Sequence, residues 1–368
     1  MLIMKKENNP RSFLVINTFG IGDVLFSTAL LRNLHDNFPE ARIDYLCNKK
    51  TAPLLKTHPF IRKVFIYERD EFVAAQKKSI FAMIRKYWQF ISEIRREKIE
   101  CAIDLSLNAP FGFFALLAGI GKRYGLNYKN RSRFLNKTVK IDGFTDKHVA
   151  DYYLDTLKLL NIPVKRCNLE VYTDAASKAW AMEFLSQNNI PKEQFVIGIA
   201  PCGGDAFGKD NYLRRWPPEH FSLLIDRLIE RYNAKIFIFA GPKEKNDVMG
   251  IIEPVTDKKA VFDLSELSLE KTVALVEHCQ LLIGNDTGIL KFADGSNKKV
   301  VAFYGPIDEK VYGPYPYDEK RTIVLKKNMP CRPCYNKFRI SPCNNDRRCL
   351  KEITVDEVMC AASNLLRS

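Results

Sequence analysis

The sequence predicts an α/β protein with two doubly wound domains, each a mainly parallel sheet covered by helices on both faces. The chain has 368 residues, more than one domain commonly holds. Short β-branched runs alternate with longer stretches of helical period, which is typical of βαβ units. This alternation starts again after residue 165. We therefore expect an N-terminal domain at 1–170, a C-terminal domain at 171–352, and a last helix within 353–368 that packs back on the first domain.

Each element is predicted from the spacing of its apolar residues. In the first half, the predicted strands are 13–17, 42–46, 64–67 and 101–105, and the predicted helices are 24–38, 79–98 and 148–160. In the second half, the predicted strands are 195–200, 235–240, 281–284 and 299–303. The predicted helices there are 175–188, 218–231, 269–278 and 355–366. Both halves should therefore form parallel sheets.

The chain is basic, with 57 Lys and Arg against 43 Asp and Glu and a formal net charge of +14. Such a charge indicates an acidic partner: nucleic acid, an anionic membrane face or a phosphorylated substrate. The basic runs are separate and no nucleic-acid-binding module is recognisable, so we do not expect nucleic acid. One run, 121–140, has seven cations and no acid. It would either meet a phosphorylated glycolipid or an anionic leaflet, or be a solvated loop.

The sequence also predicts where the protein works. No run approaches the roughly 18 apolar residues of a spanning helix, and Lys5, Lys6 and Glu7 precede an apolar stretch too short for a signal peptide. We therefore expect a cytoplasmic protein, in peripheral contact with the inner face of the cytoplasmic membrane. The predicted helix 79–98 carries Phe81 and Trp88 beside several cations. It would either lie at a membrane interface or pack its apolar face in the core.

The first motif, residues 20–23 (GIGD), lies between the first strand and the first helix. Its glycines would let backbone N–H groups approach an anion. It is not a dinucleotide fingerprint, because the third glycine would fall on Leu25. Asp23 either caps the helix or faces the crevice at the carboxyl edge of the sheet, where ligands of parallel sheets bind.

Two further motifs follow strands of the second half. Residues 201–204 (PCGG), followed by 214–218 (RRWPP), place two guanidinium groups near a Gly-rich loop, which suits a diphosphate. Trp216-Pro217 equally fits plain helix initiation. Residues 284–288 (GNDTG) would bind phosphate or a sugar hydroxyl, or simply form a turn with an Asx cap.

Four of the ten cysteines form a cluster with the spacing C-x2-C-x8-C-x5-C: Cys331, Cys334, Cys343 and Cys349. Disulfides are uncommon in the cytosol, and four thiolates suit a tetrahedral zinc or iron ion. A structural zinc or iron site, free thiols and a disulfide all remain open.

In their order along the chain, these motifs resemble those of glycosyltransferase family 9, the ADP-heptose:lipopolysaccharide heptosyltransferases. The segments that carry the resemblance are 21–24, 101–105, 214–221, 240–244, 285–288 and 304–306. The resemblance implies a GT-B fold, with two Rossmann-like domains facing each other across a cleft. It implies an inverting enzyme, with no cofactor or metal required for catalysis, that moves a sugar from a nucleotide-diphosphate donor, ADP-heptose, onto a lipopolysaccharide core or related glycan. It also implies a structural role for the Cys-rich segment 331–349.

The resemblance further implies roles for individual residues. Asp23 would be the base that deprotonates the acceptor. Gly20, Gly22 and the start of the basic run, Lys122 and Arg123, would lie on the acceptor side. The expected donor-binding residues are Gly203, Arg214, Arg215, Glu244, Asp286, Thr287, Gly288 and Lys291. Lys291 stands where the family usually has a His, which leaves open an inactive relative that only binds a sugar nucleotide or acts as a scaffold. The presence of Asp23 favours the enzyme.

Overall fold

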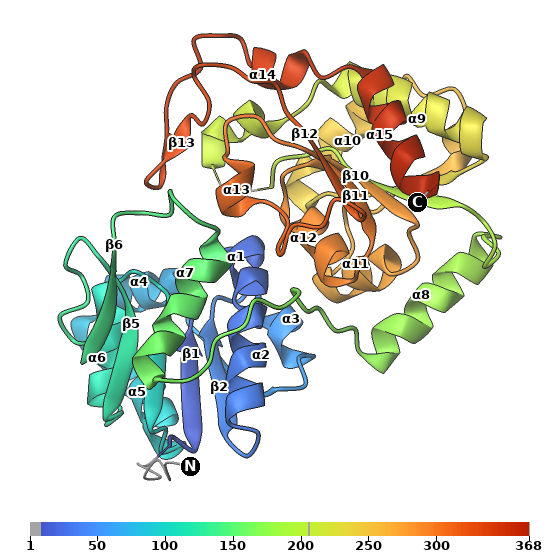
Figure 1. Cartoon of the computed structure of the whole chain (residues 1–368). Coiled ribbons are helices and arrows are strands. Elements are labelled where there is room, and N and C mark those ends of the chain that lie inside the picture. The colour runs from blue at the N-terminus through green and yellow to red at the C-terminus, as the bar shows by residue number, and fades with distance from the viewer. Residues whose placement is uncertain (1–8, 205–206, 368) are drawn as a thin grey trace, which may run out of the picture. The chain divides into compact units, whose positions relative to one another are not determined.

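The computed structural model describes residues 9–204 and 207–367, and the expectation about a signal peptide falls on residues outside this part. The chain divides into two compact units. Unit 1 contains the residues up to Gly143 together with Val149–Cys167, and unit 2 contains Phe144–His148 and the residues from Asn168 onward. Each unit is built on one six-stranded parallel sheet, as the alternation of strands and helices predicted (Figure 1).

The sheet of unit 1 has the order β3-β2-β1-β4-β5-β6. Its strands are β1 (Ser12–Ile16), β2 (Arg42–Cys47), β3 (Ile61–Ile66), β4 (Cys101–Asp104), β5 (Lys122–Tyr128) and β6 (Lys137–Ile141). The strand order reverses between β1 and β4, where Ile16 pairs with Asp104. The loops that follow β1 and β4 therefore emerge side by side at the carboxyl edge, which is where doubly wound sheets bind ligands.

The helices of unit 1 are α1 (Ile21–Phe26), α2 (Thr28–Asn37), α3 (Ala52–Lys56), α4 (Arg69–Lys78), α5 (Ile80–Arg96), α6 (Ala109–Leu117) and α7 (Val149–Asp155). The single helix predicted at 24–38 is wrong, because the helix breaks at Ser27. The Ser27 hydroxyl donates to the Val24 carbonyl at 2.6 Å and lies 2.7 Å from the Tyr45 hydroxyl. A side chain that bonds the preceding turn and a buried tyrosine thus separates α1 from α2.

The sheet of unit 2 repeats this topology, in the order β12-β11-β10-β7-β8-β9. Its strands are β7 (Val196–Ala200), β8 (Lys235–Ile238), β9 (Val261–Asp263), β10 (Leu281–Asn285), β11 (Lys299–Phe303) and β12 (Thr322–Leu325). The order reverses between β7 and β10. The Gly-rich loop after β7 and the Asp286–Gly288 turn after β10 consequently meet at the carboxyl edge.

The α-helices of unit 2 are α8 (Ala175–Gln187), α9 (Pro218–Tyr232), α10 (Lys245–Ile252), α11 (Leu269–Val276), α12 (Gly288–Gly295), α13 (Glu309–Tyr312), α14 (Arg348–Lys351) and α15 (Val355–Arg367). Short 3₁₀ turns, η2 (Gly208–Arg214) and η3 (Pro242–Glu244), follow β7 and β8. The Cys-rich segment contains a two-stranded hairpin, β13 (Tyr335–Asn336) and β14 (Arg339–Ile340).

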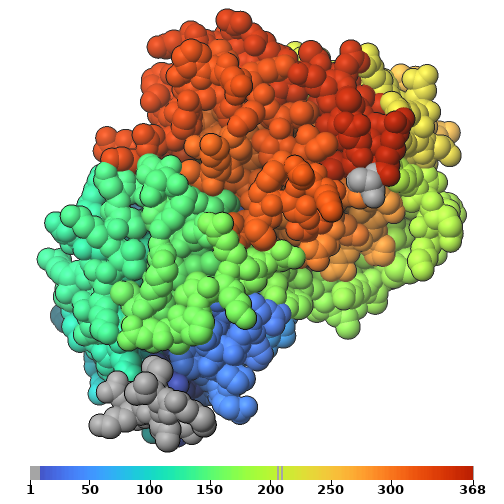
Figure 2. All heavy atoms as spheres, viewed as in Figure 1, coloured from blue at the N-terminus to red at the C-terminus, as the bar shows by residue number. Residues whose placement is uncertain are grey.

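The last helix, α15, belongs to unit 2, so the expectation that it packs back on the first domain is wrong. Its apolar face, with Val358, Ala362 and Leu365 buried, enters the same core as Phe221 of α9 and Phe303 of β11. Lys299 also donates to the Leu365 carbonyl at 2.6 Å. In the space-filling view, the red C-terminal segment lies against the orange part of unit 2 (Figure 2).

Candidate active site

In unit 1, the β1–α1 loop is held by two asparagines. Asn17 is fully buried; its side-chain amide donates to the Asp23 carbonyl at 3.2 Å and its oxygen accepts from the Phe19 amide at 3.1 Å. Asn48 donates to the Phe19 carbonyl at 2.7 Å. Gly20 occupies the cap position of α1, and Asp23 lies in the first turn. The capping alternative for Asp23 is therefore wrong, and its half-buried carboxylate lies at the carboxyl edge of the sheet.

A second carboxyl group, Asp104, ends β4 beside this loop. It is buried, and Oδ1 accepts a hydrogen bond from the Ser106 amide at 2.9 Å. Burial raises the pKa of Asp104 to about 6, because the charged form loses its hydration. Asp104 is part of the segment 101–105 that carries the family resemblance, but the sequence analysis assigned it no role. The feature of the sequence that could have identified Asp104 is an acidic residue at the end of a buried apolar strand.

The structure does not bring Lys122 and Arg123 to this edge. They begin β5, where Lys122 pairs with Cys101 at the opposite, amino edge of the sheet. The Arg123 guanidinium donates to the carbonyls of Phe134 at 2.8 Å and Ile120 at 2.5 Å. The prediction that these two residues share a site with Asp23 is therefore wrong, since a charge run does not reveal at which end of a strand it starts.

In unit 2, the loops after β7 and β10 are joined by a buried ion pair between Arg214 and Asp286. Arg214 Nη2 lies 3.0 Å from Asp286 Oδ2 and also donates to the Asp286 carbonyl. Arg214 Nη1 donates to the Gly203 carbonyl at 3.3 Å. The guanidinium thus fixes the Gly-rich loop and the Asp286 turn relative to each other.

Lys291 approaches the same carboxylate from α12. Its Nζ lies 3.4 Å from Asp286 Oδ1 and donates to the carbonyls of Tyr312 at 2.6 Å and Gly313 at 3.0 Å and to the Tyr304 hydroxyl at 2.8 Å. Burial lowers the pKa of Lys291, and Asp286 opposes that shift. Lys291 therefore ties the Asp286 turn to the loop after α13, which an imidazole in its place would do with fewer donors.

The second guanidinium, Arg215, belongs to a neighbouring network. It pairs with Glu244 at 3.3 Å and with Asp247 at 2.7 Å. Glu244 Oε1 also accepts from the Gly204 amide at 2.9 Å, and Oε2 accepts from the Gly241 amide at 3.0 Å. Glu244 thus connects the loop after β7 to the turn after β8.

Asn285 is a positioning residue that the sequence analysis did not single out. Its buried side chain donates to the Pro201 carbonyl at 2.5 Å and accepts from the Trp216 amide at 2.9 Å. The signal was a polar side chain at the buried end of an apolar strand, directly before Asp286.

Three of the residues expected to bind the donor have buried polar atoms without a partner among the described residues. Among the described residues, Thr287 Oγ1, Arg214 Nε and Arg215 Nε are buried without a hydrogen-bond partner. Such atoms are uncommon in native interiors and suit a ligand that supplies acceptor oxygens. A cavity of about 370 Å³ adjoins Arg215, while Arg214 and Thr287 are not among its lining residues. Its lining includes Pro201, Arg215, Trp216, Asp247 and Arg347.

The Cys-rich segment 331–349 contains four of the ten cysteines of the chain. All ten cysteines are free thiols. Within the described ranges, no group of three or more His, Cys, Asp or Glu side chains is arranged to hold a metal, so the structure does not support the expected zinc or iron site at Cys331, Cys334, Cys343 and Cys349.

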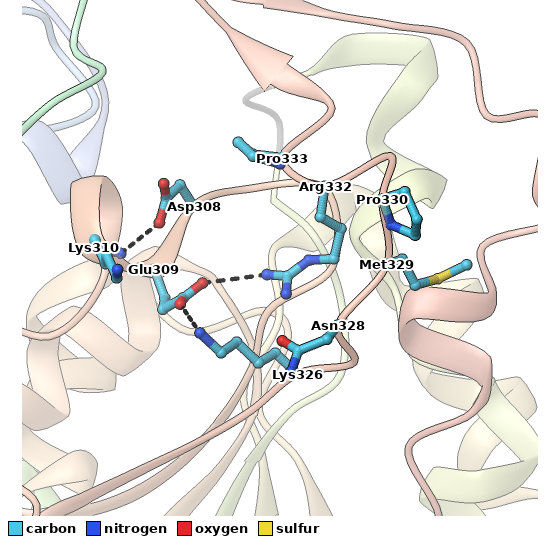
Figure 3. A pocket seen from close by; sticks show the side chains of 9 residues that line it. All are labelled: Asp308, Glu309, Lys310, Lys326, Asn328, Met329, Pro330, Arg332 and Pro333. Carbon is cyan, nitrogen blue, oxygen red and sulfur yellow. Dashed lines mark hydrogen bonds and ion pairs between the residues drawn. The ribbon is translucent and has the colours of Figure 1, made fainter.

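Arg332 attaches the Cys-rich segment to the loop that follows β11. Its guanidinium donates to the carbonyls of Gly305 at 2.5 Å and Ile307 at 3.2 Å. It also lies 3.2 Å from Glu309, and both residues line a cavity of about 410 Å³ (Figure 3).

Known proteins share this architecture. A family 9 glycosyl transferase from Veillonella parvula superposes with a TM-score of 0.80 at 22% identity, covering 97% of this chain and 98% of that one. The ADP-heptose lps heptosyltransferase II of E. coli superposes with a TM-score of 0.76 at 21% identity, covering 97% and 99%. The expected GT-B fold of two Rossmann-like domains is thereby confirmed.

The sequence comparison agrees. Lipooligosaccharide heptosyltransferase 2 of Haemophilus influenzae is 26% identical over 323 residues, which cover 85% of this chain and 88% of the relative. Residues 87–343 match the family described as glycosyltransferase family 9 (heptosyltransferase). The chain therefore belongs to glycosyltransferase family 9.

Proposed function

We propose that this family 9 glycosyltransferase moves heptose from ADP-heptose onto a lipopolysaccharide core or a related phosphorylated glycan. The observation that carries the proposal is the convergence of Gly203, Arg214 and Asp286–Gly288 at the point where the order of the unit 2 sheet reverses. Relatives that align over most of the chain are named heptosyltransferases of lipopolysaccharide or lipooligosaccharide, and the name of the E. coli heptosyltransferase II includes ADP-heptose.

The donor diphosphate would bind at the carboxyl edge of the unit 2 sheet. Thr287 Oγ1 and the two open Nε atoms of Arg214 and Arg215 are donors that phosphate oxygens can satisfy. Gly203 and Gly288 let phosphate oxygens approach the backbone closely. Glu244 would contact the nucleoside ribose, for which it would exchange part of its bonding to the Gly204 amide.

The acceptor would bind to unit 1, with Asp23 as the base and Gly20 and Gly22 beside it. Asp23 would take the proton of the acceptor hydroxyl as the oxygen attacks the anomeric carbon. The bond from that carbon to the diphosphate oxygen breaks as the new bond forms, and ADP leaves. A single displacement of this kind inverts the anomeric configuration.

Leaving-group charge is the main electrostatic demand of this reaction. One further negative charge develops on the departing diphosphate, in addition to the two that it already carries, and fixed cations stabilise it without reorganisation. Arg214 and Lys291 place two cations at Asp286. Arg215 adds a third in the neighbouring network with Glu244. These cations support a reaction that requires no metal or other cofactor.

A glycolipid acceptor would place the enzyme at the inner face of the cytoplasmic membrane. No helix among residues 9–204 and 207–367 is long and apolar enough to cross a bilayer. The contact would therefore be peripheral, and the excess of 14 positive charges favours anionic lipid.

The experiment is a pair of assays on the whole chain. ADP release from ADP-heptose should require a lipopolysaccharide acceptor that lacks heptose, and GDP- or UDP-sugars should not replace the donor. Calorimetry should show that ADP binds more tightly than GDP or UDP, and that Arg214→Ala weakens ADP binding about tenfold or more. ADP release without acceptor dependence, or equal binding of the three nucleotides, would overturn the proposal.

A further inference from the structure

The first two turns of α5 expose an apolar surface. Four large side chains point to solvent: Ile80 is 54% exposed, Phe81 79%, Ile84 55% and Trp88 60%. Their spacing of one, three and four residues places them along one side of the helix. We call these four residues the apolar strip. Neighbouring large apolar side chains at this exposure are unusual on a monomer and mark an interaction surface.

Core packing does not explain the strip, because another part of α5 already supplies the core contacts. Phe90, Ile91 and Ile94, in the second half of the helix, are buried and pack in the same cluster as Phe72 and Phe114. The helix is thus anchored by its C-terminal half, while its N-terminal half carries the strip. Covering these side chains with apolar material would therefore stabilise a bound state.

Unpaired cations surround the strip. Residues 69–96 contain seven Lys or Arg and three Asp or Glu, an excess of four positive charges. Two of the three acids are already paired: Glu71 with Lys86 at 2.6 Å and Glu93 with Lys63 at 3.0 Å. Six exposed cations make no ion pair within the part of the chain that the structure describes: Arg69, Lys77, Lys78, Arg85, Arg95 and Arg96.

A groove of about 720 Å³ borders the strip. It runs between α4 and α5, with Ala74 and Ala82 in its lining and Lys78 and Arg85 among its polar residues. Phe81 belongs to both the strip and the groove. The small apolar side chains can contact a chain of methylenes, and the two cations beside them can bind a phosphate.

We propose that the apolar strip and the cations around it dock unit 1 on an anionic phospholipid bilayer. The four apolar side chains enter the boundary between headgroups and acyl chains, as the apolar face of an interfacial helix does. Lys78 and Arg85 bind lipid phosphates, as basic residues close to an anionic leaflet do. The excess of positive charge selects an anionic lipid surface as the occupant, since a wholly apolar partner would leave these cations without counter-charges.

This inference extends the proposed function, because it names the surface through which the enzyme reaches a membrane-bound acceptor. It takes the place of one of the two alternatives for the basic run 121–140, namely that this run meets the glycolipid or the anionic leaflet. Arg123 of that run is bonded to backbone carbonyls of its own loop, whereas the cations beside the strip are unpaired. The surface includes none of the residues proposed for the donor or the base.

The test measures sedimentation with phospholipid vesicles in the absence of donor and acceptor, so its outcome is independent of transfer activity. Wild-type protein should sediment with vesicles that contain phosphatidylglycerol and not with pure phosphatidylcholine, and added salt should release it. Phe81→Ser with Ile84→Ser should lower the partition coefficient at least about tenfold. Lys78→Glu with Arg85→Glu should abolish the preference for phosphatidylglycerol.

Matched controls separate docking from folding. Met182 of α8 is 57% exposed on unit 2, so Met182→Ser removes an equally exposed apolar side chain and should leave sedimentation unchanged. Thermal unfolding should show that all variants fold. Tryptophan emission should shift to shorter wavelength on binding, and Trp88→Phe should remove that shift, because the other two tryptophans, Trp180 and Trp216, belong to unit 2.

Three results would overturn the inference. The first is equal sedimentation with both kinds of vesicle. The second is unchanged sedimentation of the Phe81→Ser, Ile84→Ser protein. The third is a dimer in analytical ultracentrifugation that this double variant dissociates, which would assign the strip to a second copy of the chain.

Discussion

Arg214 and Asp286 form an ion pair in the interior of unit 2, with Nη2 3.0 Å from Oδ2 and both side chains only 9% exposed. The pair joins the loop after β7 to the turn after β10. Lys291 also contacts Asp286 and donates to the Gly313 carbonyl, so the network reaches the loop after α13. Two cations thus share one carboxylate, which leaves these three groups with one net positive charge before any ligand binds.

Removing one member of the buried pair should be costly. Asp286→Ala leaves the Arg214 guanidinium buried and uncompensated, and should lower the free energy of unfolding by about 3–5 kcal/mol in urea denaturation. Asp247→Ala is the matched control, because its ion pair with Arg215 is half exposed and should contribute about 1 kcal/mol or less. Equal losses for the two variants would show that the Arg214–Asp286 pair does not hold the loops.

Because of Lys291, the stability of the folded chain should change with pH in the alkaline range. Burial lowers its pKa below 10.5 in the folded chain, so the unfolded chain binds more protons above that lowered value. The stability of the wild type should therefore rise relative to Lys291→Met as pH increases from the folded pKa towards about 10. Urea denaturation of both proteins across this range measures the difference. A difference in stability between the two proteins that stays constant or falls as pH rises would show that the Lys291 ammonium is not desolvated.

Asp104 should make the stability of the folded chain fall, not rise, as pH increases through the mildly acidic range. Its pKa is raised from 3.8 to about 6, so the folded chain holds a proton that the unfolded chain has lost between these values. Relative to Asp104→Asn, the wild type should lose up to about 3 kcal/mol of stability as pH rises from about 4 to about 6. The Asn variant keeps an acceptor for the Ser106 amide. Parallel pH profiles of the two proteins would place the pKa of Asp104 near its ordinary value.

The Cys-rich segment should depend on Arg332 more than on its thiols. Arg332→Met removes the donor to the Gly305 and Ile307 carbonyls and one of the two cations that pair with Glu309, and should lower the free energy of unfolding by about 1.5–3 kcal/mol. Cys331→Ser, at an exposed thiol, should change it by about 0.5 kcal/mol or less. Zinc or iron near one equivalent in protein purified without chelator, together with a large effect of Cys331→Ser, would restore the metal site.

Periodicity sufficed for the parallel sheets because their strands are buried on both faces and are therefore continuously apolar. β1 and β10 were found for this reason. β5 and β6 were not, since their sequences, KRYGLNY and KTVKI, alternate charge with apolar residues near the edge of the sheet. The break at Ser27 was also missed, because it depends on a hydroxyl that meets Tyr45 from another strand.

The donor side was predictable because motifs that follow parallel strands must meet at one edge. Gly203, Arg214 and Asp286 were brought together as expected. The internal ion pairs were not predictable, since they depend on which side chains face one another across loops far apart in sequence. For the helix predicted at 79–98, the core alternative applies to the second half, where Phe90 is buried, whereas Phe81 in the first half is exposed, and its contact with a membrane stays a prediction.

The central claim is that Asp23 of unit 1 activates the acceptor for transfer from ADP-heptose, and Asp23→Asn tests it most directly. Asp36→Asn is the control, because Asp36 is an exposed acid on α2 of the same unit. We predict that Asp23→Asn lowers acceptor-dependent ADP release by about 10²–10⁴-fold and leaves the calorimetric Kd for ADP within about twofold, while Asp36→Asn changes neither. Wild-type turnover in Asp23→Asn would contradict the claim.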